Sequence, residues 1–244
     1  MKLSFYKYLL LSSVWLVVVP FAQAQLSLSM YFDAGKNNVS EGLFLKTAGI
    51  GEYEFGKNYA GGGVQFDLRS PGTNFLSAAS MEIGREVSIR NIPFEIEGLF
   101  HYSRFSELLY EYNIGLLGNV KLDHFDFRLG THFRTYGITR DAAEEYNIDS
   151  NKRIHENWNL MYMVAYRLKP PDHEWNVSLS VTNIDHFIIE QETNPVLFLR
   201  GEYRVSDKLN VFSELWYKTA GSFNLSVNYF GFFLRTGIVW DIEL

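Results

Sequence analysis

The sequence predicts an all-β fold: a single antiparallel, up-and-down transmembrane β-barrel of about twelve strands that follows a cleaved signal peptide. Apolar and polar residues alternate with a period of two in almost every segment after Phe21. Aromatic residues make up 16% of the chain although its mean hydropathy is only −0.10, so the apolar residues are dispersed by alternation. Alternating segments of about ten residues, separated by turns, are typical of transmembrane barrels.

The N-terminal segment has the features of an export signal. Lys2 and Lys7 form a positive start, residues 9–21 are mostly apolar, and Ala22-Gln23-Ala24 is a small-x-small cleavage pattern. A transmembrane anchor is the alternative, but the apolar run is shorter than the ~20 residues that a membrane helix needs. We therefore expect a signal peptide at residues 1–24 and one barrel domain at residues 25–244.

Charge and cysteine content exclude several classes of protein. The chain carries a net charge of −6, which becomes −8 without residues 1–24 because that segment holds two lysines and no acid. An acidic protein is a poor binder of nucleic acid, so we expect no nucleic-acid partner. The absence of cysteine excludes disulfides and thiolate metal sites.

The strands can be placed in order from the alternation. At the start of the mature chain, Leu26 and Leu28 oppose Ser27 and Ser29. Further alternating segments lie at residues 59–69, 92–103, 108–121, 125–137, 157–168, 175–182, 197–204, 209–218 and 232–244. Residues 43–73 are glycine-rich and irregular, which leaves ten strands as the alternative count. A soluble β-sandwich would alternate too, but aromatic residues near strand ends favour the membrane.

The turns divide into two classes. Short connections are expected at residues 56–58, 85–91, 122–124, 169–172 and 206–208. Longer ones are expected at residues 36–41, 139–156, 185–194 and 219–227, and Ser70-Pro71-Gly72 must form a tight outer turn. Alternating the two classes gives twelve strands with both ends on the short-turn side, which in such barrels is periplasmic.

The last strand is expected to close the barrel against the first and to carry an assembly signal. Its outward residues would be Phe232, Leu234, Ile238, Trp240, Ile242 and Leu244. Closure leaves no unpaired edge in lipid. An alternating strand that ends on an apolar residue also resembles the terminal signal read by barrel-assembly machinery. That signal usually ends in an aromatic residue, whereas this chain ends in Leu244.

Charged residues are expected to gather on the inward face of the strands. The candidates for this lumen network are Glu95, Glu97, Glu111, Asp126, Arg128, His132, Arg134, Arg167, Arg200, Glu202, Arg204, Glu214 and Arg235. Rings of charge select ions in open pores. Alternatively, mixed signs neutralise one another and fill a narrow barrel. The bulky residues Leu117, Met161 and Trp216 on the same face favour a filled interior.

His101 and Ser103 form the weak catalytic candidate. The His-x-Ser pair resembles that of outer-membrane lipid hydrolases, and this resemblance implies that His101 would abstract the Ser103 proton. Sites in that family face lipid, whereas His101 shares its strand face with Glu95 and Glu97. A hydrogen-bonding histidine in the lumen is therefore the preferred interpretation, and we expect no enzyme.

No cofactor or metal is expected. The acidic residues Asp141, Glu144, Glu145 and Asp149 do not have the spacing of a calcium loop, so a solvated outer loop is preferred. The six histidines show no paired ligand spacing.

The chain after residue 24 resembles the small outer-membrane β-barrels of Gram-negative bacteria. Its Ala-Gln-Ala-Gln start and aromatic-rich strands are similar to exported barrels of the Bacteroidetes type. Residues 197–204, 209–218 and 232–244 are similar to barrels that accompany type IX secretion and gliding machinery. This resemblance implies an outer-membrane location, with membrane lipid and barrel-assembly machinery as partners.

Three functional hypotheses follow. The leading one is a porin-like barrel with a narrow or plugged polar lumen and a structural, scaffolding or limited transport role. The second is a component of a secretion or surface-assembly complex that meets other envelope proteins through the loops at residues 139–156 and 185–194. The third is a lipid-modifying hydrolase that uses His101 and Ser103.

Overall fold

The computed structural model describes residues 24–37, 43–69, 75–89, 92–104, 109–149, 153–170, 173–190, 193–218 and 230–243. Five expectations concern residues that lie mostly or wholly outside these ranges. They are the signal peptide at residues 1–24 (apart from Ala24, which begins the first strand), the loop at residues 36–41 (apart from its first two residues, which continue the first strand), the tight turn at residues 70–72, the loop at residues 219–227, and the terminal Leu244.

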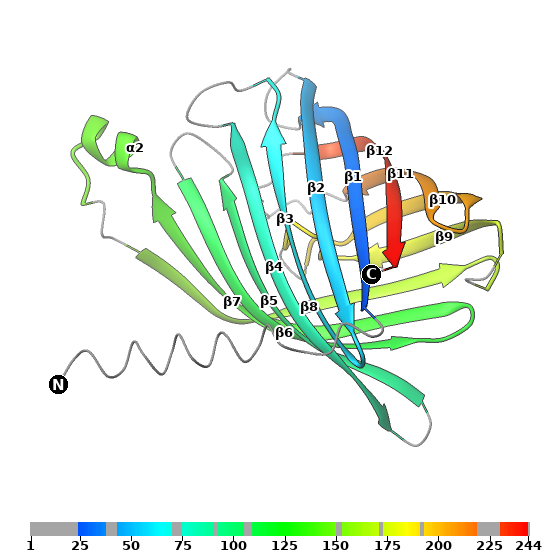
Figure 1. Cartoon of the computed structure of the whole chain (residues 1–244). Coiled ribbons are helices and arrows are strands. Elements are labelled where there is room, and N and C mark those ends of the chain that lie inside the picture. The colour runs from blue at the N-terminus through cyan, green and yellow to red at the C-terminus, as the bar shows by residue number, and fades with distance from the viewer. Residues whose placement is uncertain are drawn as a thin grey trace, which may run out of the picture.

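The described residues form twelve strands and one short helix, joined into a closed antiparallel barrel (Figure 1). The strands are β1 (Ala24–Asn37), β2 (Leu43–Phe55), β3 (Asn58–Asp67), β4 (Leu76–Ile89), β5 (Ile92–Arg104), β6 (Leu109–Lys121), β7 (Phe125–Ile138), β8 (Arg153–Arg167), β9 (Trp175–Thr182), β10 (Val196–Ser206), β11 (Leu209–Lys218) and β12 (Phe230–Glu243). The helix α2 (Arg140–Glu145) lies between β7 and β8. The predicted fold and the count of twelve are confirmed.

Closure occurs where the sequence predicts it, between the first and last strands. β1 pairs with β12 from Gln25 opposite Glu243 to Asn37 opposite Phe230. β1 pairs on its other side with β2, so that Ala24 faces Phe55. Both ends of the barrel chain therefore lie on the same side as the short turn that joins β2 to β3. Gly56 makes this turn possible, because its φ of 65° is a left-handed conformation that favours glycine.

Two predicted turns are placed incorrectly. We expected a connection at residues 85–91, but β4 continues to Ile89 and only residues 90–91 separate it from β5. We expected a loop at residues 139–156, but α2 occupies its first part and β8 begins at Arg153. In both cases the strand ladder extends past polar residues, because cross-strand pairing decides the end of a strand more than composition does.

The two faces of the barrel differ as the alternation predicts. Outward residues such as Met30, Met81 and Leu129 are exposed and apolar, as required of a surface in contact with lipid. The outward side chains of β12 follow this pattern from Phe232 to Trp240. Inward residues include most of the charged side chains of the strands, together with bulky apolar residues such as Leu117, Met161 and Trp216, and many of them are buried. Among the described residues, no helix has the length and hydropathy to cross a membrane.

Candidate functional site

A segment between β9 and β10 folds into the barrel interior instead of projecting from it. Residues 183–190, here called the lumen hairpin, turn back on themselves. The Asp185 N–H donates to the Ile188 carbonyl at 2.8 Å, and the Glu190 N–H donates to the Asn183 carbonyl at 2.7 Å. Phe187 is fully buried at the tip of the hairpin. The prediction of an outer loop at residues 185–194 is therefore wrong for its described part.

Apolar side chains explain why this segment leaves the surface. Phe187 packs in one cluster with Tyr31, Ala48, Ala78 and Phe212 from the barrel wall. Ile184 and Ile189 pack in a second cluster, with Leu99, Leu117 and Met161. Burying a side chain of this size contributes roughly 1.5–3 kcal/mol, so the hairpin gains several kcal/mol by entering the lumen.

The wall leaves room for the hairpin at residues with little or no side chain. Ala48 and Ala78 are small, and Gly63 on β3 faces the ring of Phe187. A Cβ atom added at Gly63 would lie 2.9 Å from Phe187 Cζ, which is closer than such atoms normally approach. The glycine-rich stretch that looks irregular in the sequence therefore forms the socket for the hairpin tip.

Arg235 is the main ionic anchor of the hairpin. Its Nε lies 2.8 Å from Asp33 Oδ1 on β1, and its Nη2 lies 2.7 Å from Asp185 Oδ2 on the hairpin. Its Nη1 lies 3.5 Å from Glu214 Oε2 on β11, and the guanidinium stacks over the ring of Tyr31. Burial would raise the pKa of Asp185, but the adjacent Arg235 guanidinium outweighs this effect and holds that pKa at about 2. The carboxylate thus stays charged and bound at neutral pH.

Two further anchors hold the other strand of the hairpin. Lys218 Nζ on β11 lies 2.8 Å from Glu190 Oε2, and both side chains are buried. Arg134 on β7 donates from Nη2 to the Ile189 carbonyl and from Nε to Asn113 Oδ1, the latter at 3.0 Å. These contacts are charge-assisted and reach the hairpin from different sides of the barrel wall, so they fix its depth in the lumen.

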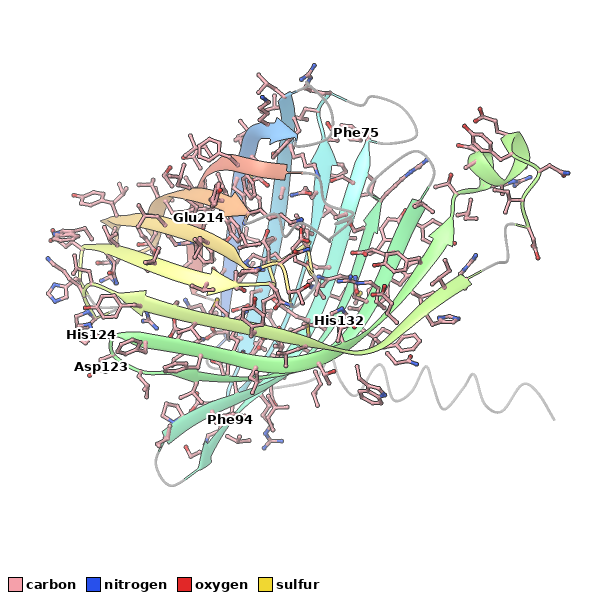
Figure 2. All side chains as sticks on the ribbon, turned by 180° about the vertical axis from the view of Figure 1, so that it is seen from behind. Phe75, Phe94, Asp123, His124, His132 and Glu214 are labelled. Carbon is pink, nitrogen blue, oxygen red and sulfur yellow. The ribbon has the colours of Figure 1, made fainter. Side chains whose placement is uncertain are left out.

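The structure places the whole predicted lumen network on the inward face of the strands. Several members are paired: Arg134 with Glu111 at 3.6 Å, Arg200 with Glu214 at 2.6 Å, Arg128 with Glu97 at 3.9 Å, Arg167 with Asp126, and Glu95 with Lys121 at 2.8 Å. Figure 2 shows the labelled side chains of Glu214 and His132 within the barrel. His132 is buried, and neither of its ring nitrogens has a hydrogen-bond partner among the described residues.

Sequence reasoning missed four residues of the anchors. Asp33 and Lys218 lie on the inward parity of their strands, and this signal was available. Asp185 and Glu190 were assigned to an external loop. Their signal is the presence of Phe187 and three isoleucines beside them, because a solvated loop would not carry so many apolar residues.

A polar cavity, here called the vestibule, lies between the hairpin and the short-turn end of the barrel. Its volume is about 610 Å³. Asp185 and His186 border it on the hairpin side, while Lys121, His173 and Arg204 border it near the short turns. Its remaining charged lining includes Glu82, Glu97, Arg128 and Arg200. Charges of both signs line the vestibule, so it can hold small polar solutes and their water.

His101 and Ser103 both face the lumen, where each is about 5% exposed. The Nδ1 atom of His101 has no hydrogen-bond partner among the described residues, so no carboxylate orients its ring through this atom. Because both side chains point away from the bilayer, neither can reach a lipid in it. The acidic residues that follow Thr139 are solvated, as expected, and Glu144 pairs with Arg140 at 2.8 Å. No three His, Asp or Glu side chains converge as metal ligands within the described ranges.

Comparisons with known proteins identify the fold. No protein-family model matches the chain, and no curated protein matches its sequence. Among solved structures, the COG4313 outer-membrane channel from Pseudomonas putida F1 is similar, with a TM-score of 0.54, 11% identity, and coverage of 92% of this chain and 97% of that chain. The KdgM porin has a TM-score of 0.50 and 9% identity, with coverage of 88% and 98%.

These likenesses show the fold of an outer-membrane β-barrel. The closed barrel and its apolar exterior agree with this result. Because open sheets and unpaired strands cannot span lipid, a closed barrel with an apolar outer surface is suited to the bacterial outer membrane, and that is where the protein resides. The finer resemblance to barrels of the Bacteroidetes type stays a prediction.

Proposed function

We propose that this outer-membrane barrel is a channel for small polar solutes and that its own lumen hairpin holds it closed. The observation that carries the proposal is the hairpin itself. A segment attached at its two ends occupies part of the lumen, and beyond its backbone contact with β8 at Asn183 it is held there by side-chain contacts instead of by ladder pairing. Such a segment can move without breaking the barrel ladder.

The vestibule supports transport over a purely structural role. A barrel needed only as a scaffold can fill its lumen with side chains from its own wall. Here the wall leaves a polar space of about 610 Å³ beneath the hairpin. The similar structures are named a channel and a porin, which agrees with this proposal. The mixed charges around the space favour solutes that are polar and carry little net charge.

Planar-bilayer conductance tests the proposal. Residues 184–189 are replaced by a Gly-Ser segment of the same length, and the variant is compared with the natural protein. We expect few openings from the natural protein and long-lived conducting steps from the variant. The same replacement at residues 140–145 is the matched control, because α2 lies outside the barrel, and it should leave conductance unchanged. A barrel that shifts on heating in gel electrophoresis shows that each variant is folded.

A point variant tests the same proposal without replacing the loop, so a misfolded loop cannot explain its result. Asp185→Asn keeps the shape of the side chain but removes the charge that pairs with Arg235. We expect more frequent openings than in the natural protein, and fewer than in the loop replacement. If both variants fold and neither conducts, the channel proposal is wrong and a structural role is favoured.

The hydrolase alternative has its own test. Because Ser103 faces the lumen, we expect the lipid profile of a Ser103→Ala strain to equal that of its parent. A shift in acyl-chain composition would revive the catalytic interpretation.

A further inference from the structure

Among the described strands, β8 is paired only in part along one of its edges. β8 has 15 residues and pairs with β7 from Tyr166 to its first residue, Arg153. Its other neighbour, β9, has only 8 residues and pairs with β8 solely between Met163 and Arg167. Beyond this short ladder, residues 154–160 have no partner among the described strands on the β9 side. These residues are here called the β8 edge.

Asn183 marks the point where pairing stops. Its backbone N–H donates to the Tyr162 carbonyl at 3.1 Å. Its side chain accepts from the Tyr162 N–H and donates to the Leu160 carbonyl, both at 2.8 Å. The amide side chain therefore continues the ladder by one step, and the main chain then turns into the lumen hairpin. The backbone groups of β8 beyond Leu160 are left without this support.

A β-bulge shapes the β8 edge. His132 faces Asn159 and Arg134 faces Glu156, so Asn157 and Trp158 together oppose the single residue between them on β7. Trp158 has a φ of 60°, which is a strained conformation for a bulky residue. Its side chain is 82% exposed, and Ile154 on the same edge is 62% exposed. Strain of this kind persists only where the surrounding structure or a ligand uses it.

The depth of the β8 edge makes an unpaired state costly. A tilted strand crosses the hydrocarbon core in ~9–11 residues. Counted from Arg167 at the short-turn end, this span reaches residues 157–159. Part of the edge therefore lies within the outer leaflet, where lipid tails offer no hydrogen-bond partner for a backbone N–H or C=O. An extended polypeptide supplies both groups, whereas a lipid cannot.

We propose that the β8 edge is a docking site for an extended segment of another envelope protein, which pairs with β8 as an added strand. A second copy of this chain is a poor occupant. Antiparallel pairing of β8 with itself requires a twofold axis across the strands, and that axis would invert one barrel in the membrane. The proposal does not depend on conductance, since the edge lies in the wall and outside the lumen.

The edge also defines the chemistry of its partner. Side chains of an added strand would alternate between the lipid and the barrel interior. Those beside Trp158 and Leu160 would face lipid and be apolar or aromatic. Those beside Asn159 and Glu156 would face the interior, where Arg134 lies 3.7 Å from Glu156, and would be polar. We therefore expect a partner segment with period-two alternation, about six to eight residues long.

Photo-crosslinking in intact cells tests the proposal. A benzophenone amino acid replaces Ile154, Asn157 or Leu160 in three separate variants of the full chain. We expect each probe to capture the same segment of one other protein. Moving the probe along β8 should move the capture point in the opposite direction along that segment. The matched control is the probe at Leu116 on β6, which faces lipid but is paired on both sides, and it should give lipid adducts only.

Three outcomes overturn the proposal. The first is lipid adducts only at the β8 edge. The second is capture of residues 219–229 of the same chain, which would show that the chain covers its own edge. The third is capture of β8 from a second copy. Hydrogen exchange gives an independent check without substitution: within residues 154–160, the amides that point away from β7 should exchange at least tenfold more slowly in native envelopes than in the purified barrel. Equal rates in the two samples would contradict an added strand.

Discussion

Two connections on the side away from the short turns differ sharply in their surroundings. The segment between β7 and β8 projects from the barrel and carries α2, and most of its side chains from Arg140 to Asp149 are exposed (Figure 1). The lumen hairpin, between β9 and β10, is mostly buried inside the wall. The sequence predicts both as outer loops, at residues 139–156 and 185–194.

The comparison shows that composition and available space decide where a loop lies. The first segment carries charged side chains in its helix, and only Ala142 and Ala143 of α2 are buried. The second offers Phe187 and three isoleucines. The wall opposite the second presents Ala48, Ala78 and Gly63, whose small size leaves a socket. An apolar loop with a matching socket folds inward because burial of its side chains outweighs the loss of chain freedom.

Arg235→Leu should have the largest effect on this arrangement. It leaves the carboxylates of Asp33 and Asp185 buried without their shared cation. We expect a loss of about 3–5 kcal/mol in the free energy of unfolding, because removing one partner of a buried ion pair leaves the other charge buried and unpaired. Urea titration of the barrel in lipid vesicles measures this loss. Arg140→Leu, at the exposed pair on α2, is the control and should change nothing measurable.

Phe187→Ala should have an intermediate effect that is confined to the hairpin. Loss of a fully buried ring costs about 3 kcal/mol. This corresponds to roughly a 100-fold change in the equilibrium between the hairpin bound in the lumen and the hairpin released from it. We expect the amides of Asp185 and Glu190 to exchange hydrogen faster by that factor, with little change in the barrel strands. Tyr146→Ala, in the exposed connection, should leave these rates as they are. Unchanged exchange in the Phe187 variant would mean that the ring does not hold the hairpin.

Thr139→Ala should have the smallest effect, restricted to the exposed connection. The Thr139 hydroxyl accepts from the Ala142 N–H at 3.4 Å and caps the start of α2. Loss of such a cap costs about 1 kcal/mol, or roughly a fivefold shift in the local opening equilibrium. Exchange of the Tyr146 amide, which donates to the Ala142 carbonyl, reports this shift. Faster exchange in the lumen hairpin as well would show that the two connections are coupled.

Strand parity made much of the structure predictable. Alternation identified the outward face of β12 and the inward position of Arg134, Glu214 and Arg235, because each strand has only two faces. The hairpin was not predicted, since alternation ends at Thr182 and the socket for Phe187 depends on residues distant in sequence. The partly paired edge of β8 was not predicted either. It arises because β9 is shorter than β8, and strand ends depend on pairing with neighbours.

The contact between Arg235 and Asp33 has a consequence for the order in which the barrel assembles. The two residues lie 202 positions apart, on the last and first strands, and they meet only when those strands pair. The same guanidinium binds Asp185, so the set of ion pairs that joins the first strand, the last strand and the hairpin is complete only when the barrel closes. An unclosed barrel therefore lacks the contact of Arg235 with Asp33, and the hairpin is held less firmly until the first and last strands pair. The step that pairs the first strand with the last is also the step that completes the ionic anchor of the hairpin.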